Sequence, residues 1–399
     1  MKNNMKKLLI ILGLAATLAA CSKNEIDSPA ERIGFDTYAL RTRAGDSYIG
    51  GNGNATTNIP VGSSFGVFAY FHPGDASTST TGTWNSTNVN LNYSNMLLNE
   101  AVTRVEPSTG TYDYTYVHSR YWPRNATDRI SFFAYYPYAA NAFVVDEGAA
   151  GDGTGITLQD PEDDHYGYSH NPVGFPKFKF VVNPDASQQV DFMISDMCLN
   201  QSKVANVLTG NDDVQFTFHH MLSQIRIKTV DFVVDNDDVT VELESFCFLG
   251  VPVSGIVTPS IASAPDATGK ATMGFAWSGL NTSNSNFTAS IYDETASEEA
   301  KQAAIMLMIP HTFSDDPDRD IVEVTFKVKR KLNAAGEYYE YTGHLTSSLG
   351  GGTLTGWERN KIYNYTIHVS LNAIDLSAEV EDWPEASTDV NTIKVDLQS

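Results

Sequence analysis

Hydrophobic and polar residues alternate along much of this chain. In residues 111–117 the tyrosines recur at every second position, which places them on one face of an extended strand. Residues 65–71 and 130–136 are rich in aromatic and β-branched side chains, and both runs stop at a proline-containing turn. The same period of two appears in residues 214–219, 225–230, 322–328, 363–369 and 393–397. The pattern therefore predicts many short β-strands.

The segments between these runs are typical of turns. Gly, Asn, Ser and Thr cluster in residues 50–58, 148–155 and 348–352. Helical periodicity is scarce, and the best candidate is a short helix at residues 295–304 with Thr295 or Ser297 as its N-cap. Short strands without alternating helices predict an all-β fold built from antiparallel β-sandwiches.

A polar stretch at residues 201–213 separates two halves of comparable length. A chain of 399 residues is long enough for two domains. We therefore predict an N-terminal β-sandwich domain at residues 44–211 and a C-terminal one at residues 212–399.

The first 21 residues have the pattern of an export signal. Lys2, Lys6 and Lys7 precede an apolar run at residues 8–20, which ends at Cys21. The sequence Leu-Ala-Ala-Cys matches the lipobox of bacterial lipoproteins, in which the cysteine thiol receives a diacylglycerol. The alternative is a transmembrane helix, but the run is short for the roughly 30 Å of a hydrocarbon core. We predict a signal peptide at residues 1–20 and a lipidated Cys21.

Composition narrows the possible partners. The chain has 26 Lys and Arg residues against 48 Asp and Glu residues, a formal net charge of −22. Such a surface repels nucleic acid and anionic lipid, so we expect no nucleic-acid partner. With 42% hydrophobic and 19% charged residues, the chain has enough apolar side chains for a packed core.

Two further cysteines, Cys198 and Cys247, allow two interpretations. They pair in an oxidising compartment, or they are buried free thiols that behave as small hydrophobic side chains. We favour free thiols because the sequence has no framework of closely spaced cysteines.

Motifs for catalysis or metal binding are missing from the sequence. It has no nucleophile elbow, phosphate loop, His-Glu-x-x-His or Cys-x-x-Cys. His219 and His220 are adjacent, and neighbours on a strand point to opposite faces, so they do not easily share one ion. The acidic stretches at residues 162–164 and 314–320 lack the spacing of a calcium loop. We predict no metal, no cofactor and no enzymatic activity.

One aromatic cluster suggests a second function. Tyr112, Tyr114, Tyr116, Tyr121 and Trp122 are close enough in sequence to form a sugar-stacking platform. Aromatic residues on a strand face are more often part of the sheet core, and we favour that interpretation. The alternative hypothesis is a surface lipoprotein that binds glycans without polymerising.

A set of motifs in a particular order resembles the fimbrillin family of Bacteroidales, the subunits of type V pili. The set follows the lipobox cysteine and covers nearly the whole mature chain. It consists of residues 33–35, 42–44, 65–71, 121–123, 130–137, 191–196, 214–225, 356–357, 363–369 and 380–383.

The resemblance implies a fold and a route of assembly. The expected fold is two transthyretin-like β-sandwich domains with Greek-key-type topology. Family members reach the outer membrane as lipoproteins, and an arginine-specific protease then removes the lipidated N-terminal segment of shaft subunits. A strand from a neighbouring subunit fills the groove, which is β-augmentation. The implied partners are other fimbrial subunits, outer-membrane lipid, the protease and a host or bacterial surface receptor; the implied role is in adhesion and biofilm formation.

The pro-segment of this chain is expected at residues 21–43. Residues 33–40 have the pattern of a strand that completes the first domain before cleavage. Its expected displaced residues are Ile33, Phe35, Tyr38 and Leu40. Cleavage is expected after Arg43, with Arg41 as the second choice. Alternatively, these arginines flank a strand and are never cut.

The C-terminal residues 391–398 are a candidate donor strand. Ile393, Val395 and Leu397 lie two residues apart and share one face. The alternative is an ordinary edge strand of the C-terminal domain. The family also contains anchor and tip subunits, and the sequence leaves the choice between shaft, anchor and tip open. The expected location is the outer membrane for the precursor and the cell-surface fimbrium for the mature protein.

Overall fold

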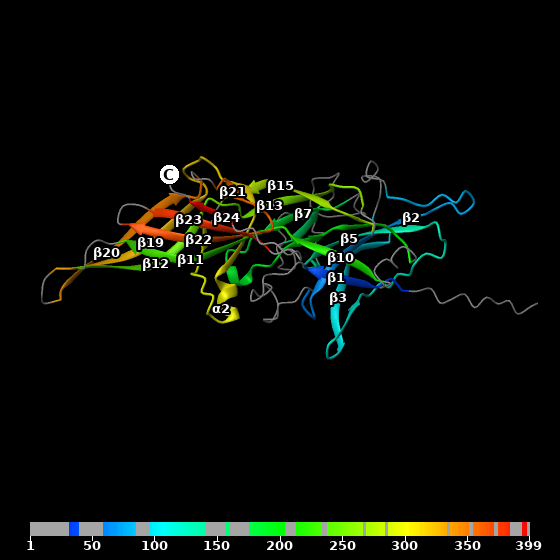
Figure 1. Cartoon of the computed structure of the whole chain (residues 1–399), viewed down its shortest axis with the longest axis horizontal. Helices are drawn as coiled ribbons and strands as arrows, with labels where there is room; N and C mark the ends of the chain where they lie inside the picture. Colours follow the sequence, from blue (N-terminus) through cyan, green and yellow to red (C-terminus); the bar gives the residue numbers. More distant parts are fainter. Residues whose placement is uncertain are drawn as a thin grey trace, which may run out of the picture.

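The computed structural model confirms the all-β prediction (Figure 1). It describes residues 32–39, 59–84, 94, 96–140, 156–159, 175–203, 213–233, 238–265, 269–283, 286–332, 336–350, 354–370, 374–383 and 393–396. Within these residues no helix is both long enough and apolar enough to cross a membrane. The transthyretin-like Greek-key topology in detail stays a prediction.

A nine-stranded sheet dominates the N-terminal half. Its main path runs β1-β10-β8-β5-β2-β3-β4, while β9 pairs with β5 and β14 pairs with β9. The strands are β1 (Phe35–Ala39), β2 (Ser64–His72), β3 (Leu97–Ser108), β4 (Thr111–Thr115), β5 (Arg129–Tyr136), β8 (Met193–Ser195), β9 (Met197–Gln201), β10 (Val214–His220) and β14 (Lys270–Ala271).

The central strands of this sheet are buried on both faces. In β2, Phe65 and Val67 point into one hydrophobic core, whereas Phe68 and Tyr70 point into another on the opposite face. The same division occurs in β5. Burial on both faces explains why these strands are continuous apolar runs rather than alternating ones.

One face of the large sheet is covered by a four-stranded sheet with the order β15-β13-β7-β6. Its strands are β6 (Ile156–Gln159), β7 (Lys177–Val181), β13 (Ser254–Ile261) and β15 (Met273–Asn281). The ring of Phe178 on β7 lies 5.0 Å from that of Tyr135 on β5, centroid to centroid, so the two layers are in direct contact. A short 3₁₀ turn, η2 (Ala186–Gln188), follows β7.

The strand pairing crosses the expected domain boundary at residues 211/212. β10, β13 and β14 follow residue 212, yet β10 pairs with β1 and β8, β13 pairs with β7, and β14 pairs with β9, all from the first half. The sheets are therefore not divided at residue 212. Division into an N-terminal and a C-terminal sandwich at this position stays a proposal.

The remaining strands form the C-terminal sandwich. One sheet has the order β17-β11-β22-β23-β24, the other has β16-β12-β19-β20, and β18 pairs with β21. The strands are β11 (Ser223–Val233), β12 (Val239–Leu249), β16 (Asn286–Thr288), β17 (Ile305–Met308), β18 (His311–Thr312), β19 (Ile321–Lys331), β20 (Tyr338–Ser348), β21 (Gly356–Trp357), β22 (Lys361–Ser370), β23 (Ile374–Asp382) and β24 (Ile393–Asp396). Among the described residues, the one α-helix is α2 (Glu298–Ala303), where the Ser297 hydroxyl accepts from the Ala300 N–H at 3.3 Å, so Ser297 acts as the cap.

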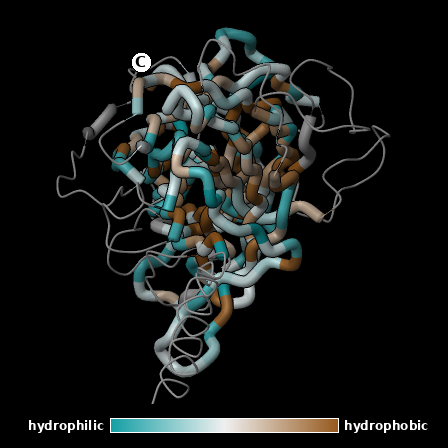
Figure 2. Tube along the Cα trace, turned by 90° about the vertical axis from the view of Figure 1, so that its right-hand side faces the viewer, coloured by the Kyte–Doolittle hydropathy of each residue, from teal (hydrophilic) through white to brown (hydrophobic). Residues whose placement is uncertain are grey.

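One hydrophobic core runs through both halves of the molecule. It joins Phe68 and Tyr135 of the first half to Trp357 and Tyr365 of the second. Figure 2 shows hydrophobic residues concentrated inside and hydrophilic ones towards the surface. Where the halves meet, the imidazole of His220 stacks on Trp383 at 3.9 Å.

The two histidines at this junction have separate roles. Nδ1 of the buried His220 lies 2.8 Å from the Asp191 carboxylate. The half-buried His219 lies 3.0 Å from Asp196 instead. The two histidines therefore pair with different carboxylates.

Both cysteines are buried free thiols. The Cys198 thiol donates to the Gln215 carbonyl at 3.3 Å, and burial raises the pKa of Cys247 to about 11. They therefore act as packing residues in the described structure.

Candidate assembly site

β1 is an edge strand that encloses the hydrophobic core containing Phe65 and Val67. Its inward residues are Ile33, just before the strand, followed by Phe35 and Thr37, and all three are buried. The ring centroid of Phe35 lies 6.0 Å from that of Phe132 and 5.9 Å from that of Phe216. β1 thus fills a groove lined with aromatic side chains.

Backbone hydrogen bonds hold the beginning of this segment on both sides. On one side, β1 runs parallel to β10, and the Val214 N–H donates to the Gly34 carbonyl at 2.9 Å. On the other side, the Ile33 N–H donates to the Arg120 carbonyl at 2.9 Å, and Arg32 forms a bridge with Tyr121. The large sheet therefore curls until its two edges meet at β1.

Two tyrosine hydroxyls reinforce this closure. The hydroxyl of Tyr116 donates to the Ile33 carbonyl at 2.8 Å. The hydroxyl of Tyr114 on β4 lies 2.6 Å from the Thr37 hydroxyl, and burial raises the pKa of Tyr114. Both side chains come from the β4 edge of the sheet. Their hydrogen bonds therefore connect that edge to β1 at the opposite edge.

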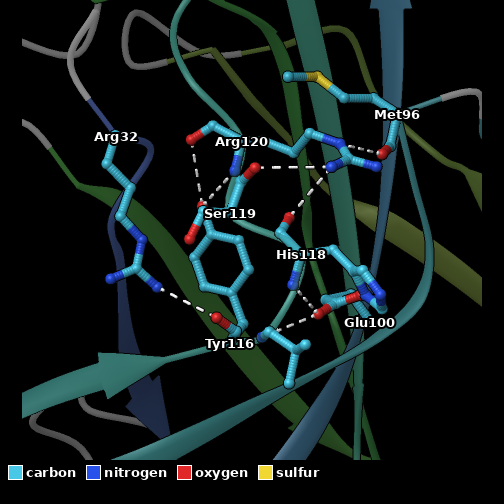
Figure 3. Close-up of polar contacts among 8 residues, drawn as sticks. Arg32, Met96, Glu100, Tyr116, His118, Ser119 and Arg120 are labelled. Carbon is cyan, nitrogen blue, oxygen red and sulfur yellow. Dashed lines mark hydrogen bonds and ion pairs between the residues drawn. The ribbon is translucent and has the colours of Figure 1, made fainter. Parts of the chain in front are cut away.

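Arg32, just before β1, contacts Tyr116 (Figure 3). Its guanidinium lies 4.4 Å from the ring centroid of Tyr116, within the range of a cation–π contact. One of its N–H groups donates to the Tyr116 carbonyl at 3.4 Å. Tyr116 therefore contacts Arg32 and Ile33 through its ring, its hydroxyl and its backbone.

The wall of the groove is braced by residues outside β1. The Glu100 carboxylate accepts from the backbone N–H groups of Val117 and His118, at 3.1 and 2.9 Å (Figure 3). Its other oxygen lies 2.8 Å from His118 Nδ1, and Arg120 Nε donates to the Met96 carbonyl at 2.9 Å. These bonds do not involve β1.

The structure describes only some of the residues predicted for this site. Ile33 and Phe35 lie in the groove, whereas Cys21, Leu40, Arg41, Arg43 and Leu397 lie outside the described residues, as does the side chain of Tyr38. Thr37, Tyr114, Tyr116 and Arg32 were missed as groove residues. The signal for Thr37 was the strand period itself, because Ile33, Phe35 and Thr37 are two residues apart whereas Tyr38 and Leu40 have the opposite parity.

The candidate donor strand lies in the second half. β24 pairs antiparallel with β23, with Ile393 opposite Val380 and Val395 opposite Ala378. It is one of the two edge strands of the five-stranded sheet. This position matches the alternative of an edge strand in the monomer, and a donor role requires β24 to leave that edge.

The five aromatic residues of the sugar-platform hypothesis do not share a surface. Tyr114, Tyr116 and Trp122 are buried in the hydrophobic core that contains Phe65 and Val67. Tyr112 and Tyr121 are exposed, by 50% and 51%. A stacking platform needs accessible ring faces, so the interpretation of these residues as sheet core is the one that the burial favours. Within the described residues, no group of three or more His, Cys, Asp and Glu side chains is placed to hold a metal.

The hydrogen bond from the Tyr116 hydroxyl to the Ile33 carbonyl can be tested directly. Replacing Tyr116 with Phe should lower the free energy of unfolding of the intact chain by about 1–3 kcal/mol, because the buried Ile33 carbonyl loses its side-chain donor. Urea unfolding of the intact chain measures this change. Tyr112→Phe is the matched control, since Tyr112 is half exposed and lies on the same hairpin. Equal stability of the two variants would show that the hydrogen bond from Tyr116 to Ile33 does not stabilise the fold.

Comparison with known proteins identifies the class. The model of the fimbrillin-like family matches residues 42–383, most of the chain. The protein belongs to the fimbrillin-like family. This membership supports a fimbrial subunit at the cell surface, a structural role rather than an enzymatic one.

One solved structure shows a related fold at low sequence identity. A fimbrial protein from Bacteroides vulgatus is 18% identical, with 88% of this chain and 99% of that chain covered and a TM-score of 0.53. A fimbrilin from Porphyromonas gingivalis is 10% identical, with coverage of 90% and 99% and a TM-score of 0.40. No curated protein matches the chain by sequence.

Proposed function

We propose that this protein is a fimbrial subunit that is exported as a lipoprotein and polymerises after proteolysis. Cys21 carries the lipid that holds the precursor at the outer membrane. An arginine-specific protease then cuts after Arg43, or after Arg41, and separates β1 from the rest of the chain. The observation that carries the proposal is the position of β1, a core-filling edge strand that ends at Ala39, two residues before Arg41.

Cleavage changes the stability of β1 in its groove. Before the cut, β1 is part of the same chain as β10 and β4. After the cut, it is held by hydrogen bonds and aromatic contacts alone and is free to dissociate. Departure exposes the edge of β10 together with Phe132 and Phe216, which lie against Phe35 in the precursor. An unpaired strand beside an apolar surface is a template for a strand from another chain.

The donor in this proposal is the segment at residues 391–398, which contains β24. β24 pairs with β23 over four residues, from Ser377 to Val380 of the partner strand. Because this pairing is short, β24 loses few backbone hydrogen bonds when it leaves β23, fewer than the contacts available in the groove. Chains that both accept and donate a strand form a shaft, whereas a chain that keeps its lipid serves as an anchor.

In this proposal the mature protein lies in a cell-surface fimbrium. Its partners are copies of itself or related subunits, and its role is adhesion to a host or bacterial surface and biofilm formation. The glycan-binding hypothesis has lost its specific support, because Tyr114, Tyr116 and Trp122 are buried. We therefore prefer the polymerising subunit.

Incubating the purified lipidated precursor with an arginine-specific protease tests the proposal. We expect release of a chain that begins at Ala44 or Thr42, followed by ladders of SDS-resistant oligomers. N-terminal mass spectrometry identifies the cut, and electrophoresis without boiling reports the oligomers. A chain that is cut cleanly at either arginine yet stays monomeric would contradict assembly by strand exchange.

A further inference from the structure

The accepting strand and the root of the donor segment meet at one buried junction. β10, the strand on which β1 lies, ends at His220, and β23 ends one residue before Trp383. The imidazole of His220 lies flat on the indole of Trp383, with 3.9 Å between the ring centroids and 10° between the ring planes. Both side chains are 1% exposed, so water is excluded from this contact.

His220 is tied to the large sheet on the side of the groove. Its Nδ1 lies 2.8 Å from the Asp191 carboxylate, and its backbone lies opposite Met193 of β8. The imidazole cannot turn away from Trp383 without breaking the buried hydrogen bond to Asp191. A displacement of β10 along its axis therefore displaces the ring that contacts Trp383.

A chain of backbone hydrogen bonds joins the same two points. The Trp383 N–H donates to the Asn360 carbonyl at 2.9 Å, and the Asn360 N–H donates to the Leu222 carbonyl at 3.0 Å. Leu222 follows the end of β10 by two residues. Side-chain stacking and backbone hydrogen bonds thus connect the end of β10 with the end of β23.

The strand register makes this connection short. Gln224 at the start of β11 lies opposite Ile362 of β22, and Ile362 lies opposite Glu381 of β23. The route from β10 to Trp383 therefore crosses only neighbouring strand ends of the five-stranded sheet. The other sheet of the C-terminal sandwich, with β12, β19 and β20, does not lie on this route.

From this geometry we infer that the contact between His220 and Trp383 transmits tension along the fimbria, an inference that rests on the proposed function. In a shaft, the strand of one neighbour pulls on β10, and the donor segment of the subunit itself pulls on Trp383. The stacked rings connect these two points directly, so tension strains this contact before it strains the core of the C-terminal sandwich. The lifetime of a subunit under force depends on its rate of unfolding, which the contacts strained first control.

A second contact between a histidine and a tryptophan provides a matched control. His311 is buried, lies 2.7 Å from Asp320, and has its ring centroid 5.3 Å from that of Trp357. His311 belongs to β18, which pairs with β21. The two sites share a buried imidazole, a carboxylate and an indole, but the second does not join β10 to β23.

Pulling single polymers at constant force tests the inference. Polymers of protease-cut His220→Gln subunits should unfold roughly tenfold faster than the wild type, because the stacked ring that transmits tension is missing. Trp383→Phe keeps an aromatic ring at the junction and should give an intermediate rate. His311→Gln polymers should unfold within about twofold of the wild-type rate, since their junction is intact.

The outcomes separate the inference from the proposed function. Unfolding of His220→Gln polymers at the wild-type rate, or equal acceleration in His220→Gln and His311→Gln, would overturn the inference and leave the proposed function intact. Failure of the wild-type chain to polymerise would count against the proposed function.

Hydrogen exchange measures the junction in the intact chain, without polymerisation. Under conditions of local opening, the amides of Asn360 and Trp383 should exchange roughly tenfold faster in His220→Gln than in the wild type, because the rings no longer hold these strand ends together. In His311→Gln the same amides should exchange at the wild-type rate. Unchanged exchange of both amides in His220→Gln would overturn the inference even for a chain that does not polymerise.

Discussion

Replacing Phe35 with alanine is expected to lower the free energy of unfolding of the precursor by about 3–5 kcal/mol. The Phe35 side chain is 2% exposed and contacts Tyr116, Phe132 and Phe216, so its loss leaves a cavity where both edges of the large sheet meet. Urea or thermal unfolding of the intact precursor measures the change. Because β1 is an edge strand, we also expect faster hydrogen exchange at its backbone amides than in β2 or β5.

A surface substitution near the same segment is the matched control. Tyr121→Ala removes an aromatic ring that is 51% exposed and should change the stability by less than about 0.5 kcal/mol. If Phe35→Ala were as mild as Tyr121→Ala, β1 would not be a structural part of the core. The proposal that its removal opens a groove would then lose its basis.

The second large effect concerns the arginines that follow β1. The double variant Arg41→Gln/Arg43→Gln should keep β1 in its groove and abolish SDS-resistant oligomers, because β1 stays connected to the rest of the chain. Changing both residues to lysine separates charge from protease specificity. The lysine variant retains the positive charges but should also resist an arginine-specific protease, and electrophoresis of the digested precursor reports both results.

Arg32 provides the internal control for this experiment. It precedes β1, so a cut there leaves the strand attached to the rest of the domain. Arg32→Gln should therefore leave protease-dependent oligomers in place, although it loses the contact with Tyr116. Oligomers that form in the double variant but vanish in Arg32→Gln would place the functional cut before β1 and contradict the assembly model.

Much of the local structure followed from residue alternation. The runs that predicted strands in residues 65–71, 130–136, 214–219 and 322–328 lie within β2, β5, β10 and β19. The aromatic run of residues 111–117 was also interpreted correctly as sheet core at Tyr114 and Tyr116. These assignments succeed because a period of two is a property of neighbouring residues and needs no information about distant ones.

The candidate site was predictable only in part. The pattern around Ile33 and Phe35 indicated a strand followed by arginines, and β1 confirms the strand. It did not indicate that Thr37 meets Tyr114 or that Tyr116 holds the Ile33 carbonyl, because these partners are 77 and 83 residues apart. Asp213 illustrates the same limit, because the sequence does not show that this residue of a polar stretch lies against Gly34.

By itself, the sequence determined where strands form, that the fold is all-β, and that a strand precedes Arg41 and Arg43. The tertiary structure alone decided that β10 pairs with β1, and that strands from both halves share sheets and one continuous core. It also decided which aromatic side chains are buried around Phe35. The physical reason is that alternation specifies the two faces of a strand, whereas strand partners are selected by the summed packing and hydrogen bonding of distant segments.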